Sequence, residues 1–160
     1  MPLEPTRHAS GLRAWRGSVP VASRYTVGPA GERFFRALKD HARILGTHCG
    51  RCGVTYVPGR LFCERCFDEL REWTEVGPEG TVESVTALYL APDGLRLAQP
   101  ALLALIRLDK ASTVLVHRLG DLGADDAKIG LRVEPVFKPA ADRTGSILDI
   151  LHFRPTRPDR

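Results

Sequence analysis

Long apolar runs are absent from this sequence of 160 residues. No segment approaches the length of about eighteen consecutive apolar residues that a membrane-spanning helix needs. Residues 1–30 also lack the continuous apolar core of a secretory signal. We therefore expect a cytoplasmic protein that does not contact a membrane. Since 43% of the residues are hydrophobic, the chain still has enough apolar side chains for a modest core.

Recognisable catalytic motifs are absent as well. The sequence has no G-x-S-x-G nucleophile motif, no glycine-rich phosphate loop and no motif of paired carboxylates. We therefore predict no catalytic residue and no active site that this chain forms by itself.

Excess positive charge is missing from most of the chain. Residues 1–48 contain eight Lys and Arg against three Asp and Glu, whereas residues 49–76 have a net charge of −1 and residues 77–160 are neutral. The overall net charge of +4 thus belongs to a tail and a helix. A module that binds single-stranded nucleic acid needs a basic groove with aromatic stacking platforms. This alternative function is therefore disfavoured, although zinc ribbons and OB-folds each perform it in other proteins.

Cysteine is equally scarce, and its placement is informative. The four cysteines form two C-x2-C pairs with ten residues between them: Cys49, Cys52, Cys63 and Cys66. In a reducing compartment, four cysteines with no stray one favour metal binding over disulfides. Because Zn²⁺ prefers four tetrahedral ligands, we predict one structural zinc ion per chain, bound by all four thiolates. An iron site of rubredoxin type and a thiol redox couple are the alternatives.

The residues around the cysteines predict a zinc ribbon. Gly53 follows the second cysteine, where the turn often needs a positive φ, but Phe67 stands at the matching position of the second pair. A turn at Pro58 and Gly59 predicts a hairpin with the two cysteine turns at matching ends. His48 is predicted to be an ordinary exposed histidine. Three arginines are expected to offset the negative charge of the thiolates: Arg51, Arg60 and Arg65.

An arm and a helix precede the ribbon. Residues 1–30 contain four prolines and three glycines without sustained periodicity, which predicts an extended arm. Residues 31–46 carry apolar side chains at helical spacing and predict an amphipathic helix that ends near Gly46. Its apolar stripe consists of Phe34, Leu38, Ala42 and Leu45. This stripe packs either on the chain's own domain or on another subunit.

After a zinc ribbon over residues 47–76, residues 77–154 predict a β-barrel, followed by a tail over residues 155–160. Strands are expected at 81–90, 101–108, 112–119, 131–138 and 146–153. The second is apolar on both faces and should be central, while Pro135 places the fourth at an edge or a bulge. The predicted fold is mainly β, with an N-terminal helix, a rubredoxin-like zinc ribbon and a five-stranded OB-fold barrel. Periodicity alone also permits an SH3-like barrel or a sandwich.

The order of these segments resembles a known protein family. "RFFRALKDHARILGTHCGRCGVTYVPGRLFCERC", "EWTEVGPEGTVESVTALYLAP", "ALLALIRLDKASTVLVHRLG" and "KIGLRVEPVFK" resemble the zinc-ribbon/OB-fold proteins associated with thiolases and other acyl-CoA enzymes. The resemblance covers about residues 31–153. Its most specific positions are Trp73, Gly80 and Val82, then Ile129, Gly130 and Val133.

The resemblance implies an accessory subunit. Family members bind a thiolase-like or hydratase subunit and help to form its acyl-CoA site, with the OB-fold near the bound CoA. By this likeness Cys49, Cys52, Cys63 and Cys66 are zinc ligands, and no catalytic residue carries over. The implied partner is a thiolase-like or other acyl-CoA enzyme, and acyl-CoA itself is a further candidate partner.

Overall fold

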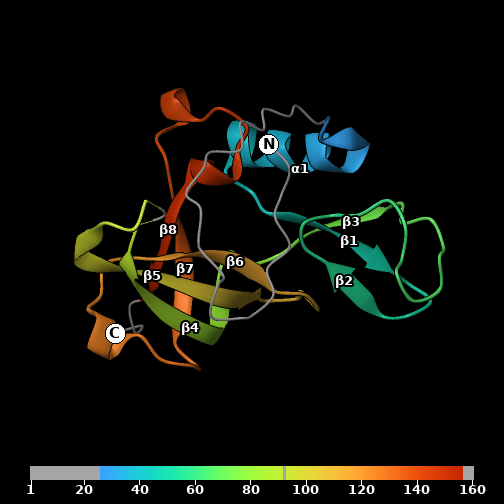
Figure 1. Ribbon diagram of the computed structural model, residues 1–160. Coiled ribbons are helices and arrows are strands. Elements are labelled where there is room, and N and C mark those ends of the chain that lie inside the picture. Colours follow the sequence, from blue (N-terminus) through green and yellow to red (C-terminus); the bar gives the residue numbers. More distant parts are fainter. Residues whose placement is uncertain (1–25, 92, 157–160) are drawn as a thin grey trace, which may run out of the picture.

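A computed structural model describes residues 26–91 and 93–156 of the chain. Within these residues the protein has one α-helix, eight strands and three 3₁₀ turns (Figure 1). The elements are α1 (Gly28–His41), β1 (Leu45–Cys49), β2 (Val54–Tyr56), β3 (Glu72–Glu75), β4 (Gly80–Leu90), β5 (Arg96–Leu108), β6 (Leu115–Leu119), η2 (Ala124–Asp126), β7 (Arg132–Phe137), η3 (Ala140–Asp142), η4 (Ile147–Asp149) and β8 (Ile150–Pro155). No helix of the described part is long and apolar enough to cross a membrane. The predicted arm lies outside the described residues except for its last five positions, the final three of which begin α1.

Helix α1 is shorter than predicted at its C-terminal end. It ends at His41, and Ala42 takes up the left-handed conformation with φ 52°. Gly46 does not end the helix, because it lies inside β1. A Cβ atom at Gly46 would lie 2.6 Å from the carbonyl oxygen of Tyr56. The glycine therefore permits close contact between β1 and the neighbouring strand, a role that a local pattern does not distinguish from a helix stop.

The apolar stripe of α1 packs on its own chain. Phe34 and Leu38 are fully buried and belong to one hydrophobic cluster with barrel residues that include Ile106 and Phe153. The helix lies over the barrel and the ribbon (Figure 1). Packing within the chain, the first of the two alternatives for this stripe, is therefore confirmed. The predicted members Ala42 and Leu45 lie beyond the helix.

The five strands after the ribbon form a closed barrel in the order β4-β5-β6-β8-β7. Strand β7 pairs again with β4, and β6 and β8 are the one parallel pair among the described strands of the barrel. This order is the Greek-key topology of the OB-fold, so the predicted fold class is confirmed against the SH3-like and sandwich alternatives. Strand β5 pairs with both β4 and β6 and is central, as predicted.

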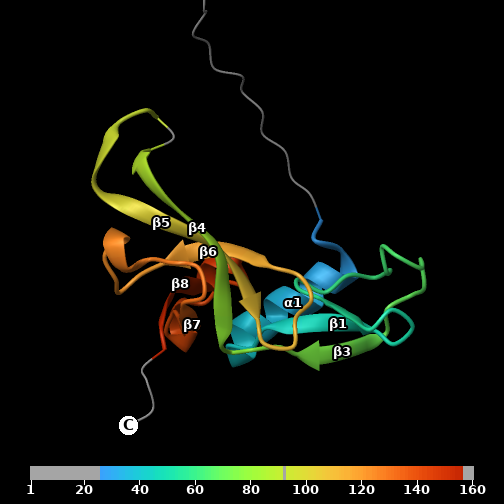
Figure 2. The same ribbon diagram turned by 90° about the horizontal axis from the view of Figure 1, so that it is seen from below.

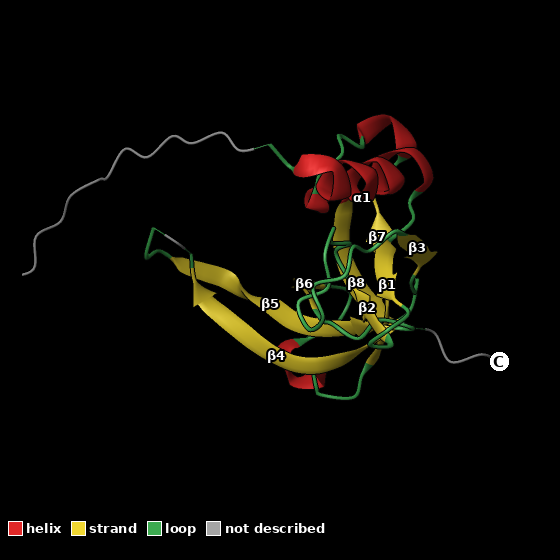
Figure 3. Cartoon of the chain, turned by 90° about the vertical axis from the view of Figure 1, so that its right-hand side faces the viewer, coloured by secondary structure: helices red, strands yellow, loops and turns green. Residues whose placement is uncertain are grey.

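Strands β4 and β5 extend beyond the barrel as a two-stranded arm. Strand β5 begins at Arg96, five residues earlier than predicted, and pairs with β4 as far as Leu90. Its pairing with β6 covers only Leu102 to Ile106. The projecting part, which we call the β4–β5 arm, is clear in Figures 2 and 3.

Strand β7 contains Pro135 at a position that tolerates the missing N–H donor. Its pairing with β4 ends at Val133, and its pairing with β8 has an irregularity between Val136 and Phe137. The expected bulge is therefore present beside Pro135; β7 is not an edge strand of the closed barrel, but its side toward β4 is unpaired beyond Val133.

Strand β6 begins at Leu115, three residues later than predicted, because the preceding residues bind the ribbon. The N–H of Val57 donates to Oγ1 of Thr113 at 2.8 Å, and that hydroxyl donates to the carbonyl oxygen of Val57 at 3.0 Å. The N–H of Ser112 donates to the carbonyl oxygen of Thr55 at 2.8 Å. These bonds join the barrel to β2.

The fifth predicted strand begins four residues late, since residues 147–149 form the 3₁₀ turn η4. The carboxylate of Asp149 accepts N–H groups from Thr144 at 2.9 Å, Gly145 at 2.7 Å and Ser146 at 3.2 Å. Burial raises the pKa of this carboxyl, but the three donors and the charge of Lys138 outweigh it, so its pKa lies below the ordinary value. One buried carboxylate thus holds the loop before β8.

Replacing this carboxylate is expected to destabilise the fold. Asp149→Asn should cost about 1–3 kcal/mol, because an amide cannot accept all the N–H groups that the carboxylate accepts. Since the folded pKa is lowered, the stabilisation is present above the unfolded pKa near 3.9 and is lost as the pH falls through the folded pKa. Urea denaturation from neutral pH into this acid range should show the difference between wild type and variant shrinking.

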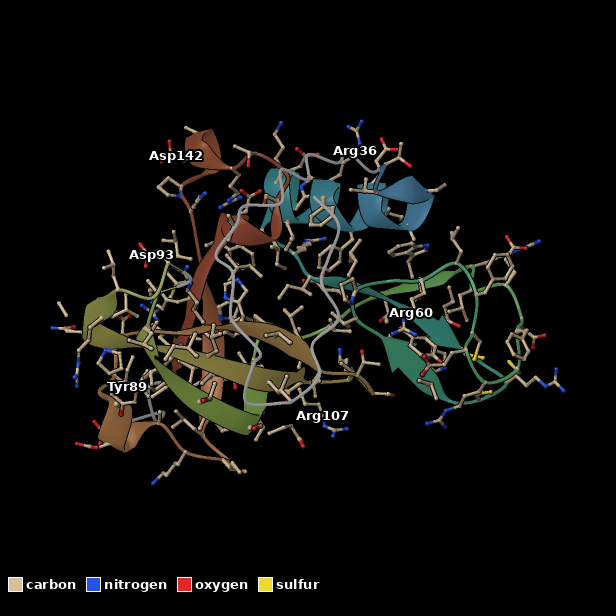
Figure 4. The ribbon with its side chains drawn as sticks, in the orientation of Figure 1. Arg36, Arg60, Tyr89, Asp93, Arg107 and Asp142 are labelled. Atoms are coloured by element: carbon tan, nitrogen blue, oxygen red, sulfur yellow. The ribbon has the colours of Figure 1, made fainter. Side chains whose placement is uncertain are left out.

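The matched control is Asp142→Asn in η3, where the aspartate is exposed (Figure 4). It should leave the free energy of unfolding almost unchanged. The charge of Asp149 would not have the role assigned to it if Asp149→Asn and wild type differed by the same free energy of unfolding at neutral and acid pH.

Candidate metal centre

The ribbon is a three-stranded sheet in the order β2-β1-β3. The first cysteine turn joins β1 to β2, whose antiparallel pairing runs from Thr47 with Tyr56 to Cys49 with Val54. The second turn lies between Phe62 and Glu69, which form an isolated bridge. The predicted hairpin around Pro58 and Gly59 was therefore wrong: each cysteine turn closes its own pair of extended segments, and residues 58 and 59 connect them.

The two cysteine turns have the same backbone geometry. The N–H of Gly53 donates to the carbonyl oxygen of Cys49 at 2.8 Å, and the N–H of Phe67 donates to that of Cys63 at 2.9 Å. Gly53 has φ 65° and Phe67 has φ 61°. Phe67 thus adopts the left-handed conformation that a side chain makes costly, and its side chain is 78% exposed. The second turn therefore has the same geometry as the first, although phenylalanine stands where the first turn has glycine.

The turns bring all four cysteine side chains together. The Sγ atoms of Cys49, Cys52, Cys63 and Cys66 all lie within 4.8 Å of one another. Sulfur atoms around a tetrahedral zinc ion, with Zn–S bonds of about 2.3 Å, stand about 3.8 Å apart. The cluster lies at the end of the ribbon away from the barrel (Figure 4). These four residues could therefore hold one metal ion.

Hydrogen bonds prepare one of the four thiols to ionise. The hydroxyl oxygen of buried Tyr56 lies 3.3 Å from Sγ of Cys63, and the N–H of Arg65 points to the same sulfur at 3.4 Å. The Tyr56 contact, with the neighbouring N–H groups, outweighs burial and lowers the pKa of Cys63 to about 6. The same contact raises the pKa of Tyr56 to about 12. These contacts therefore favour the thiolate of Cys63, which is the form that binds metal.

The arginines near the cluster differ in their contacts. Arg51 lies 3.5 Å from the carboxylate of Asp68, and this carboxylate, with the sulfurs of Cys66 and Cys52, raises the pKa of Arg51. Arg60 stacks over the ring of Tyr56 at 4.9 Å and pairs with Glu64. Of the three arginines expected to offset thiolate charge, Arg51 faces that charge most directly.

His48 is not part of the cluster. Its Nδ1 atom lies 3.0 Å from Oγ1 of Thr55, and its side chain is half-buried. The expectation that it is exposed was wrong, because β1 is the middle strand of the ribbon and its side chains are covered on both faces. Over residues 26–91 and 93–156, the four cysteines are the single group of three or more His, Cys, Asp or Glu side chains placed to hold a metal.

Trp73 attaches the ribbon to α1, a contact that sequence reasoning did not foresee. The guanidinium of Arg33 lies 4.7 Å from the centre of the Trp73 ring. A Cβ atom at Gly59 would lie 2.5 Å from the same ring. Trp73 in β3 is therefore held between a helix cation and a glycine backbone. The resemblance had marked this position without a physical reason.

The other positions marked by the resemblance lie where the barrel closes. A Cβ atom at Gly80 would lie 2.6 Å from the carbonyl oxygen of Arg107. Val82 exchanges backbone hydrogen bonds with Gly130 at 2.8 Å and Leu131 at 2.9 Å, and its side chain is fully buried. Gly130 has φ 87°, which favours glycine. These residues shape the barrel.

The strained position of Phe67 can be tested by stability. Phe67→Gly is expected to stabilise the metal-loaded protein by about 1 kcal/mol, because glycine adopts a positive φ without steric cost. The control is Phe62→Gly, because Phe62 is also exposed but has a negative φ. This substitution should lower the free energy of unfolding by a similar amount. Guanidinium denaturation measures both, and a loss of stability in Phe67→Gly would contradict the strain.

Comparisons with known proteins agree with this architecture. Residues 73–138 match the family described as "ChsH2, C-terminal OB-fold domain". A DUF35 domain-containing scaffold protein of Methanocaldococcus jannaschii is 27% identical over 111 residues, which cover 66% of this chain and 75% of the relative. A protein of the same description from Methanothermobacter thermautotrophicus is 24% identical over 107 residues, covering 66% and 80%.

Two solved structures have a similar fold. A DUF35-family protein of unknown function from Sulfolobus solfataricus is 35% identical, with a TM-score of 0.59 and coverage of 68% of this chain and 78% of that chain. The structure titled "Ltp2-ChsH2(DUF35) aldolase" has a TM-score of 0.60 at 24% identity and covers 82% of this chain and 98% of that chain. The resemblance drawn from the sequence is thus confirmed, and the chain belongs to the DUF35 family.

Proposed function

We propose that this chain is an accessory subunit that binds a thiolase-type, hydratase or aldolase acyl-CoA enzyme and helps to form its acyl-CoA site. The observation that carries the proposal is the β4–β5 arm. Its outer part bears large exposed apolar side chains, with Tyr89 55% and Leu95 68% exposed. Figure 4 shows Tyr89 on the far side of the barrel from Arg60 of the ribbon, so the arm lies away from the ribbon.

The arm is built in a way that suits a contact with another protein. An isolated two-stranded hairpin is only marginally stable in water, and its outer edges leave backbone N–H and C=O groups without strand partners. Apolar side chains exposed on such a hairpin are also unfavourable in free energy, because their surface is in contact with water. Clustered exposed apolar side chains of this kind mark interaction sites. A partner surface that covers the arm would remove both costs.

The relatives support a role in assembly. Two of them are described as scaffold proteins. A structure with the same fold has a title that names an aldolase together with ChsH2(DUF35). These descriptions apply to those proteins and favour, for this chain, a partner that performs the chemistry. The acyl-CoA substrate class follows from the family resemblance of the sequence.

The metal that we propose for the cysteine cluster is a single structural zinc ion. Four thiolates in a closed tetrahedral set leave no open position for a substrate, which favours structure over catalysis. The four cysteines are unpaired thiols, a state that suits the reducing cytoplasm in which we place the complex.

Metal analysis tests the zinc proposal. The purified chain is expected to be colourless and to contain about one zinc ion. Cys63→Ser should lower the zinc content and the thermal stability, because structural zinc contributes on the order of 10–16 kcal/mol of apparent binding free energy near pH 7. His48→Ala is the control and should retain the zinc. A red protein with about one iron atom, or a metal-free protein that is fully folded, would contradict the proposal.

Co-expression tests the function itself. We expect the chain to copurify in a defined complex with a thiolase-type enzyme of the same genome, and condensation or cleavage of acyl-CoA to need both subunits. Leu95→Ser should weaken the complex, whereas the control Ile129→Ser, at a residue 70% exposed but outside the arm, should not. Full activity of the isolated enzyme, with no binding of this chain, would refute the proposed function.

A further inference from the structure

The outer face of the barrel carries an apolar groove. One hollow of 340 Å³ lies between β5, β6, η4 and β8, and a second of 180 Å³ lies over β4, β5 and β6. Both are lined by Leu103 and Val116, so the two hollows are adjacent. We call this surface the β5–β8 groove.

The exposed apolar side chains of the groove face away from the barrel core, and Ile150 of the core forms part of its floor. In β6, Leu115, His117 and Leu119 are buried, so the intervening Val116 and Arg118 point outward. Strand register places Val116 opposite Leu105 of β5 and Arg118 opposite Leu103.

Exposure marks the groove as a contact surface. Val116 is 59% exposed, and Leu148 of η4 and Leu151 of β8 are 60% and 45% exposed. The fold does not need these three side chains to be apolar, because they lie outside its core. Contiguous apolar side chains with this exposure are typical of interaction sites.

The charges around the groove are of one sign. Arg118 and Lys138 line the larger hollow, and neither hollow has an acidic lining residue. Neither cation lies within ion-pair distance of a carboxylate that the structure describes, although the charge of Lys138 acts on the buried Asp149 carboxyl beneath it. A second copy of this chain would bring like charges together across an isologous contact. The complementary surface is therefore apolar and acidic.

Nucleic acid fits the groove poorly, although it would supply negative charge. No Phe, Tyr or Trp side chain lines either hollow, and His117, which lines the larger one, is buried, so exposed stacking platforms for bases are missing there. Among the barrel aromatics, Phe153 is fully buried and Phe137 is half-buried beneath Arg143. Apolar side chains flanked by cations favour a protein surface instead.

The wall of the groove is already in place. Ile147 and Leu148 lie on η4, which is held by the Ser146 cap and by the buried Asp149 carboxylate. The opposite wall consists of paired strands. A partner therefore meets a formed surface and needs little further ordering of this chain.

We propose that the β5–β8 groove is a docking site for a protein segment that presents Leu-type or Phe-type side chains beside Asp or Glu. The apolar side chains fill the two hollows, and the carboxylates pair with Arg118 and Lys138. This inference rests on the proposed function and specifies which face of the barrel meets the partner and what chemistry the partner presents.

The first experiment uses the complex with the thiolase-type enzyme and measures its dissociation constant. Val116→Glu and Arg118→Glu should each weaken binding by about tenfold or more. The matched controls Ile129→Glu and Lys128→Glu, exposed residues outside both hollows, should change it by less than about twofold. Arg118→Lys should retain most of the wild-type affinity because lysine keeps the positive charge. Circular dichroism melting checks that every variant is folded.

The outcomes separate the two proposals. Groove variants that bind like wild type would overturn the docking site and leave the proposed function intact. A wild-type chain that binds no thiolase-type enzyme overturns the proposed function, and the groove is then tested without that enzyme.

The second experiment titrates the full, metal-loaded chain with two synthetic amphipathic peptides and follows backbone amide resonances by NMR. A Leu/Glu peptide should shift the amides of Val116, Arg118 and Leu148, and a Leu/Lys peptide should not. Equal responses to both peptides, or no response there to the acidic one, would overturn the proposal. Dodecanoate is the third probe. If it saturates these amides and the acidic peptide does not, the groove binds a small amphipathic anion and the proposal fails.

Discussion

The ribbon lobe has too few apolar side chains to maintain its own fold, and the architecture depends on how that shortage is met. Its separate core contains only Val54, Tyr56 and Leu70 around the cysteines. A segment of about thirty residues buries too little surface to be stable alone. At its outer end, four thiols gather where one ion can cross-link them. At its inner end, hydrogen bonds to Thr113 and the contact of Trp73 with Arg33 join it to the rest of the chain.

The helix makes the ribbon and the barrel into one body. Phe34 and Leu38 share a single core with Ile106 of the barrel and Val57 beside the ribbon. The ribbon and the barrel therefore stand in a fixed relation to each other. A partner that contacts the β5–β8 groove meets a surface already in place, which lowers the conformational entropy lost on binding. The apolar surfaces are outside the core, and the core is what orients them.

Sequence patterns correctly predicted the elements whose conformation depends on residues nearby in the chain. The C-x2-C spacing predicted the cysteine cluster, and alternating apolar residues predicted most of the barrel strands. Gly46 was misread because its reason is the carbonyl oxygen of Tyr56 in another strand. Residues 146–149 were wrongly predicted to be in a strand, because here one carboxylate accepts hydrogen bonds from the N–H groups of a loop. Tyr89 and Leu90 have the pattern of buried strand residues, and only the closure of the barrel before them leaves them exposed.

The loop that forms one wall of the groove is independent of the barrel ladder. Leu148 points outward, while the loop's backbone is joined to the barrel at two carbonyl oxygens: that of Asp149 accepts the N–H of Lys138 at 2.8 Å, and that of Ile147 lies 3.3 Å from Nε2 of His117. Substitutions at the outward positions can therefore accumulate in descendants without disturbing any strand pairing. A few loop side chains can thus change while the aspartate and the strands behind it stay the same.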